Sequence, residues 1–121
     1  MINNNYNTII IYMEKFEKGK VFNMSNVIDY AEDGVISKEI IHNNAGSVTL
    51  FSFDAGQGLS EHFAPFDALL SVFDGEMELT VEGIVYNIKQ GESYVIPSGA
   101  RHSVKANQPF KMTITMIRGN E

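Results

Sequence analysis

The sequence contains no cysteine. Without thiols the chain has no disulfide framework, no thiolate nucleophile, and no zinc finger or iron–sulfur site, because each of these needs cysteine. Any metal ion would have to be held by histidine, by carboxylates or by water. The absence of cysteine therefore narrows the chemistry that the chain can perform.

Basic residues are few and long apolar runs are missing. Nine Lys and Arg residues stand against 15 Asp and Glu residues, which gives a formal net charge of -6. This charge repels phosphate backbones and anionic lipid surfaces. The longest apolar run near the start, residues 9–13, is far shorter than the roughly 20 residues of a membrane span, and it lacks the flanks of a signal peptide. We therefore expect a cytoplasmic protein that binds neither nucleic acid nor membranes.

The size of the chain predicts a single domain. Its 121 residues are 44% hydrophobic and 20% charged, values that fit one globular core. We expect a domain over residues 21–121, preceded by an N-terminal extension over residues 1–20. Within the extension, Ile9, Ile10 and Ile11 are predicted to form a strand against a sheet edge, either of this chain or of a second subunit. The alternative is a misassigned start codon, with translation beginning at Met13.

Short β-type segments separated by turns fill the chain from Val35 onward. Two hairpin turns are predicted, one at residues 43–46 and one at Asp74-Gly75. The predicted strands are residues 35–41, 47–53, 68–73, 76–82, 85–88, 93–96, 102–106 and 110–117. About eight to ten short strands with regular turns predict an all-β sandwich or barrel.

Two of these segments alternate apolar and polar residues. Residues 76–82 place Met77, Leu79 and Val81 on one face and acidic residues on the other, so the first face is predicted to be core and the second to face water. In residues 110–117 the apolar face carries two methionines, which either pack in the core or line a cavity.

Two glycine- and histidine-containing motifs resemble those of the cupin family. The first motif matches at Gly56, His62 and Gly75, and the second at Gly91, Pro97, Gly99 and His102. The resemblance covers about residues 45–117. It implies a small single-domain cupin, an all-β double-stranded β-helix or jelly-roll barrel of roughly eight to ten antiparallel strands. The mouth of such a barrel holds a ligand or a metal, and small bacterial members are often homodimers.

The chain departs from the family pattern at the metal ligands. Metal-binding cupins use three His and one Glu, whereas here the second His position is Ala64 and the Glu position is Ala68. The neighbouring Asp67 is offset by one residue, which points it to the opposite face of a strand. His62 and His102 remain as two of the four ligands. Methyl groups in place of an imidazole and a carboxylate predict a roomier and more apolar cavity.

The favoured interpretation is a homodimeric protein that binds a small polar or anionic molecule. In this interpretation, the ligand is contacted by His62, His102, Ala64, Ala68 and Met112. A second interpretation is a metal-dependent enzyme of the dioxygenase, isomerase or decarboxylase type. A weakly bound divalent transition metal would then sit on His62 and His102, with further positions filled by water or by a carboxylate of the substrate. No cofactor is required by the residues.

A third interpretation is metal-free acid–base isomerisation of a sugar or keto compound, with one of the two motif histidines as base. Tyr86 or Tyr94 could supply the acid if either hydroxyl reached the pocket. The remaining histidine, His42, lies beside a predicted turn and is interpreted as a surface residue. The sequence leaves open whether the protein is an enzyme.

Overall fold

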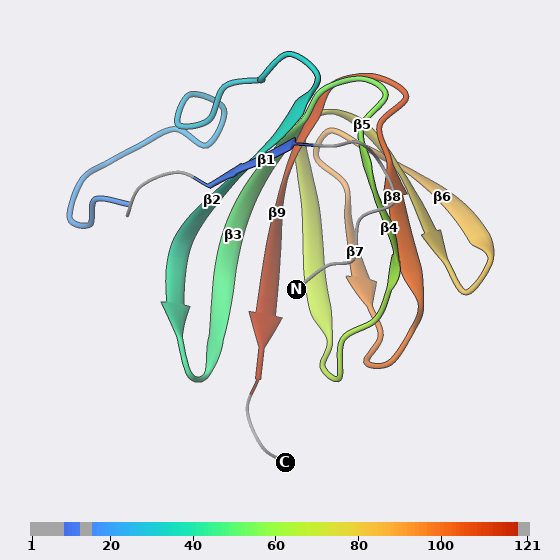
Figure 1. Cartoon of the computed structure of the whole chain (residues 1–121). Coiled ribbons are helices and arrows are strands. Elements are labelled where there is room, and N and C mark those ends of the chain that lie inside the picture. The colour runs from blue at the N-terminus through green and yellow to red at the C-terminus, as the bar shows by residue number, and fades with distance from the viewer. Residues whose placement is uncertain (1–8, 13–15, 119–121) are drawn as a thin grey trace.

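The computed structural model describes residues 9–12 and 16–118, which form nine β-strands (Figure 1). The strands are β1 (Ile9–Tyr12), β2 (Gly34–Asn43), β3 (Gly46–Phe53), β4 (Gly58–His62), β5 (Ala68–Val81), β6 (Ile84–Lys89), β7 (Ser93–Ile96), β8 (His102–Lys105) and β9 (Phe110–Ile117). Within these residues no helix is long and apolar enough to cross a membrane.

The strands form two sheets that share the long strand β5. One sheet runs β1-β2-β3-β9-β5, with β7 beyond the first half of β5. The other contains β4, β8, the second half of β5, and β6. Every pairing is antiparallel except that of β1 with β2. Figure 1 shows the two sheets facing each other as a curled barrel, which confirms the predicted all-β jelly-roll fold.

The predicted hairpin turn at Asp74-Gly75 is wrong, because β5 continues through it. The pairing of β5 with β9 shifts register between Val72 and Asp74 and ends at Gly75, and from Glu76 onward β5 pairs with strands of the second sheet. Gly75 has a φ of 73°, and a Cβ atom there would lie 2.2 Å from the carbonyl oxygen of Pro109. Glycine is therefore required at this bend, where the backbone of β5 lies in close contact with that of Pro109.

The core lies between the two sheets. Met77 and Leu79 are fully buried, as their alternation with acidic residues predicts. Phe53 of β3 and Phe110 of β9 stack in the same core with ring centroids 4.7 Å apart. This packing fixes the positions of β3 and β9, the two strands that form one wall of the cavity described below.

A second, smaller cluster covers part of the outer face of the first sheet. Ile28, in the segment before β2, packs with Ile36 and Leu50. Lys111, on the face of β9 that the alternation assigns to solvent, is buried because this segment covers it. Its Nζ donates a hydrogen bond to the Ser25 carbonyl at 2.9 Å.

The N-terminal strand β1 pairs in parallel with residues 34–37 of β2 in the same chain. Ile10 packs against the main core. The rest of the predicted extension before residue 16 lies outside the described residues.

Candidate functional site: a pocket lined by two histidines

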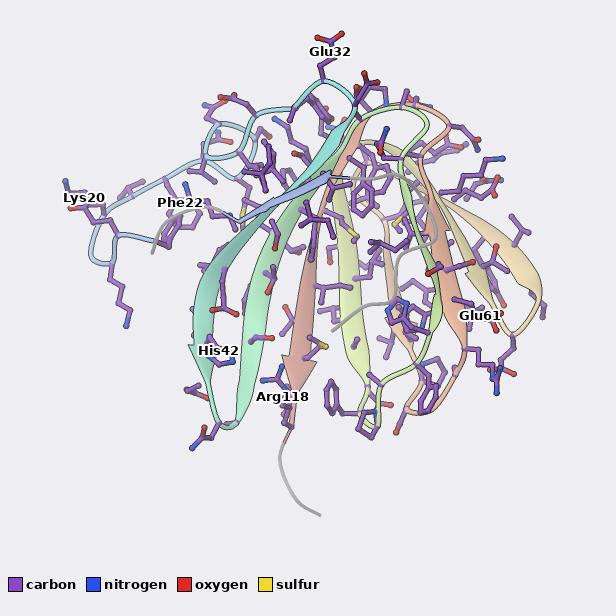
Figure 2. All side chains as sticks on the ribbon, in the orientation of Figure 1. Lys20, Phe22, Glu32, His42, Glu61 and Arg118 are labelled. Carbon is purple, nitrogen blue, oxygen red and sulfur yellow. The ribbon has the colours of Figure 1, made fainter. Side chains whose placement is uncertain are left out.

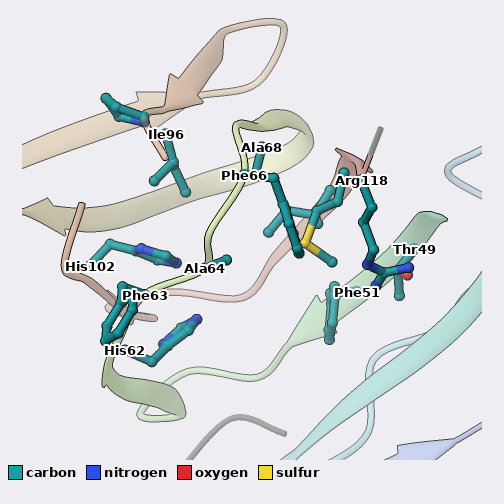
Figure 3. Close-up of a pocket in the computed structure, with 13 residues that line it drawn as sticks. Thr49, Phe51, His62, Phe63, Ala64, Phe66, Ala68, Ile96, His102 and Arg118 are labelled. Atoms are coloured by element: carbon teal, nitrogen blue, oxygen red, sulfur yellow. The ribbon is translucent and has the colours of Figure 1, made fainter. Parts of the chain in front are cut away.

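A cavity of about 290 Å³ opens between the two sheets (Figure 3). Strands β3, β4, β7, β8 and β9, the loop before β5, and the first residue of β5 all contribute side chains. The lining residues are Thr49, Phe51, His62, Phe63, Ala64, Phe66, Ala68, Ile96, Pro97, His102, Ile114, Met116 and Arg118. Most of the lining is apolar, and none of the lining residues in the described part of the chain is acidic.

The structure brings His62 and His102 together. His62 ends β4 and His102 begins β8, and the two residues are direct partners in the antiparallel pairing of these strands. Their ring centroids lie 4.2 Å apart with an interplanar angle of 59°. Figure 3 shows both rings on the same side of the cavity.

Backbone carbonyl groups fix the orientation of both rings. Nδ1 of His62 lies 2.9 Å from the Ser60 carbonyl oxygen, and Nδ1 of His102 lies 3.0 Å from the Ala100 carbonyl oxygen. A carbonyl oxygen only accepts hydrogen bonds, so each Nδ1 carries the proton and donates. In the neutral rings, each Nε2 therefore keeps its lone pair and acts as an acceptor.

Burial lowers the pKa of His102 below its usual value of 6.5. The nearby His62 lowers this pKa further, whereas the hydrogen bond to the Ala100 carbonyl raises it. His102 is only 7% exposed, so water does little to stabilise its charged form. The ring is consequently neutral near pH 7 and available as a hydrogen-bond acceptor.

Arg118 lies across the cavity from the histidine pair, directly after β9 (Figure 3). Its guanidinium carbon is 5.4 Å from the centre of the Phe66 ring, a cation–π arrangement. In the described part of the chain, no ion pair involves Arg118. The motifs did not point to this residue. The alternation of β9 contained the signal, because Ile114, Met116 and Arg118 continue one inward-facing row.

Aromatic residues make up much of the remaining wall and were also missed. Phe51 comes from β3, and Phe63 and Phe66 come from the loop between β4 and β5. Loop residues have no periodicity that would predict their direction. The inward position of Phe51 follows from strand alternation with the buried Phe53.

Ala64 and Ala68 both line the cavity, as the motif alignment predicts. Met112 does not line it. This residue is 1% exposed and lies between its cross-strand partners Phe51 and Val72, so it belongs to the closed core. The cavity-facing methionine of β9 is Met116.

The other candidate residues lie outside the pocket lining. The carboxylate of Asp67 accepts a hydrogen bond from the Ser98 amide at 2.8 Å. Tyr86 and Tyr94 pack on each other with ring centroids 4.9 Å apart, and neither lines the cavity. His42 is exposed on β2 (Figure 2) and does not line the cavity.

The sequence profile of the cupin domain matches residues 49–118, more than half of the chain. This chain belongs to the cupin family. The match contains both histidines and Arg118. Comparison with curated proteins gives no match.

Solved cupin structures share the fold. A conserved protein of unknown function from Streptococcus pyogenes is 25% identical, with a TM-score of 0.83 over 91% of this chain and 96% of the other. A cupin 2 conserved barrel domain protein from Leptotrichia buccalis is 36% identical, with a TM-score of 0.78 over 80% of this chain. This cupin spans only 47% of that protein. A salicylate 1,2-dioxygenase mutant from Pseudoaminobacter salicylatoxidans is 14% identical with a TM-score of 0.64, a similarity of fold alone.

The residues of this cupin do not fit the metal centre that metal-binding members of the family contain. Two imidazoles are present, but methyl groups occupy the other two ligand positions, at Ala64 and Ala68. Residues 9–12 and 16–118 contain no group of three or more His, Cys, Asp or Glu residues that could hold a metal ion. Protein metal centres with an open position normally supply three ligands, so this donor set is one short.

Proposed function

We propose that this cupin binds a small organic molecule in the cavity, with the two histidines accepting hydrogen bonds from a polar group of the ligand. The observation that carries the proposal is the pair of rings held by the Ser60 and Ala100 carbonyls, with both Nε2 atoms left as acceptors. Two convergent acceptors in an apolar cavity fit a ligand that offers hydroxyl or amine hydrogens.

The size of the cavity limits the ligand. Its volume of about 290 Å³ lies at the lower end of the roughly 300–1,000 Å³ typical of pockets for drug-sized molecules. Apolar residues form most of the wall, so burial of an apolar ligand body would supply binding energy. The histidine pair would then orient the ligand rather than provide most of its affinity.

Binding accounts for the site better than either enzymatic interpretation. A metal-dependent reaction needs a third ligand, and Ala64 and Ala68 do not supply one. Metal-free proton transfer needs an acid within hydrogen-bond reach of the base, yet the described lining residues include no carboxylate and no tyrosine.

A thermal-unfolding screen with a library of small hydroxy and amino compounds tests the proposal. A compound bound at the proposed site should raise the Tm of the wild-type protein and lose most of this effect in His62→Ala and His102→Ala. His42→Ala is the matched control, because this third histidine is exposed on β2, and it should respond as wild type does. Equal stabilisation of all four proteins by every active compound would contradict the proposed site.

We also propose that the chain forms a homodimer through the outer face of the first sheet. A row of paired residues crosses five strands on this face, and none of them is charged. The row consists of Ile41, Val48, Thr115, Leu69 and Val95. Its exposed members Ile41, Leu69 and Val95 are 54%, 43% and 56% accessible. The same uncharged row on a second copy would cover it around a two-fold axis.

A further inference from the structure

Arg118 gives the cavity a positive end opposite the histidine pair. The residue lines the cavity, and Figure 3 shows its side chain beside Thr49 and Phe51, across the cavity from both imidazole rings. A ligand that contacts both ends must therefore present two different polar groups. The group at Arg118 must accept hydrogen bonds, because guanidinium only donates them.

Arg118 differs from the other arginine of this acidic protein in its ion pairing. The chain carries a net charge of -6, and its other arginine, Arg101, pairs with Glu61 at 3.5 Å. Within residues 9–12 and 16–118, Arg118 has no such carboxylate partner and no acidic residue lines the cavity. The contact with the Phe66 ring orients the guanidinium without neutralising it. The pocket thus contains a permanent positive charge that a ligand anion can pair with.

Apart from the two histidines, Thr49 and Arg118, the described lining residues are apolar. They include Phe51, Phe66, Ile114 and Met116, so the part of the ligand between its two polar ends must be hydrocarbon-like. A low-dielectric wall also strengthens an ion pair with Arg118 relative to the same pair in water.

We propose that the Arg118 end of the pocket binds a carboxylate, so that the ligand is a small organic acid with an apolar body and a hydrogen-bond donor at its far end. This inference rests on the proposed function of the histidine pair and adds the chemical class of the ligand. The planar guanidinium matches a carboxylate with two parallel hydrogen bonds. A single arginine suits one negative charge better than a phosphate dianion, for which proteins usually gather several donors.

Matched acids and amides test this inference by isothermal titration calorimetry near neutral pH. The probes are 4-hydroxyphenylacetate with 4-hydroxyphenylacetamide, and 6-hydroxyhexanoate with 6-hydroxyhexanamide. At least one acid should bind wild-type protein about tenfold or more tightly than its amide, since the amide keeps the shape but loses the charge. Arg118→Gln should remove this preference, because it should raise the Kd of the acid and leave the Kd of the amide unchanged.

Two controls separate the pocket from general electrostatics. Arg101→Gln removes the same charge from the surface and should leave both Kd values unchanged. Arg118→Lys keeps a positive charge without the planar fork and should retain part of the preference. Arg118→Gln should fold normally, because the residue contributes its backbone amide, rather than its side chain, to the hydrogen bond with the Ala45 carbonyl.

Three results would overturn the inference. The first is equal binding of acid and amide to wild-type protein, in which case a binding site sensitive to His62→Ala would still support the proposed function. The second is no binding of any probe up to about 10 mM. The proposed function would then still be tested by the thermal-unfolding screen described above. The third is tighter binding of 4-hydroxybenzylphosphonate than of 4-hydroxyphenylacetate, with the difference lost in Arg118→Gln.

Discussion

At the scale of single residues, the pocket combines two fixed acceptors with two methyl groups. His62 and His102 are held by backbone carbonyls, so their orientation does not depend on a ligand. Ala64 and Ala68 stand where the family pattern has a third imidazole and a carboxylate, and they leave the space to the cavity. These two methyl groups supply no metal ligand, and they leave space in the cavity for the organic ligand proposed above.

The lowered pKa of His102 predicts how stability changes with pH. In the unfolded chain the ring titrates near 6.5, and burial lowers this pKa in the folded state. The unfolded state therefore binds more protons between the two pKa values, so the stability contributed by neutral His102 is complete above about pH 6.5 and is lost as pH falls from there toward the folded pKa. Urea unfolding of wild type and His102→Gln across this range measures the effect. His102→Gln should lose less stability on acidification, and identical pH profiles would contradict the assignment.

The site could be predicted from the sequence only where a motif marks it. His62, Ala64, Ala68 and His102 follow from the glycine and proline spacing, and each of them lines the cavity. Arg118 lies outside the motifs, and only its position in the alternation of β9 would have shown it. Met112 shares that alternation but lies too deep, because strand periodicity gives the face of a residue and not its depth in the barrel.

At the scale of elements, β5 joins the two halves of the fold. Its first half pairs with β7 and β9, and its second half pairs with β6 and β8. The sequence predicted most strands correctly but divided this one at Asp74-Gly75, because that dipeptide is a strong hairpin signal. The actual hairpin is at Glu82-Gly83, where both residues have positive φ. Local turn propensity cannot distinguish a turn from a bulge whose glycine is required by a neighbouring strand.

Substitution of Gly75 should destabilise the fold more than substitution of a hairpin glycine. Both Gly75 and Gly83 have positive φ, so alanine costs about 1–2 kcal/mol of backbone strain at either position. At Gly75 the new Cβ would also meet the Pro109 carbonyl oxygen at 2.2 Å, whereas at Gly83 no atom of the described residues, apart from its two chain neighbours, lies within 4 Å of it.

We expect Gly75→Ala to cost about 3 kcal/mol or more and Gly83→Ala to cost only the strain, as measured by denaturant unfolding. Equal losses would show that the backbones are not in close contact at Gly75.

At the scale of the whole molecule, the outer face of the first sheet is covered over only part of its surface. The segment before β2 packs on that part through Ile28 and through contacts of Ser25 and Tyr30 with the buried Lys111 of β9. The uncharged row of Ile41, Val48, Thr115, Leu69 and Val95 lies on the same face, and its members Leu69 and Val95 remain exposed. Neighbouring exposed apolar side chains on one face of a sheet favour association.

The proposed homodimer predicts a particle of twice 13.5 kDa, about 27 kDa, in sedimentation-velocity experiments. The double variant Leu69→Lys, Val95→Lys would put two charges from each subunit into the interface and should shift the protein to monomer. The control carries lysines in place of Ile84 and Val85, which are similarly exposed but lie on β6 of the other sheet. It should remain dimeric. A wild-type particle of 13.5 kDa would contradict the dimer.

Nitrogen-15 NMR of the histidine side chains tests the central claim most directly, because the chain has only three histidines. In the free protein near pH 7.5, Nδ1 of both His62 and His102 should carry a proton, and the neutral ring of His102 should have an unprotonated Nε2. Saturation with the most stabilising compound of the thermal screen should shift both Nε2 signals and leave those of His42 in place. A bound compound that leaves the Nε2 signals of His62 and His102 unchanged would show that these histidines do not form the binding site.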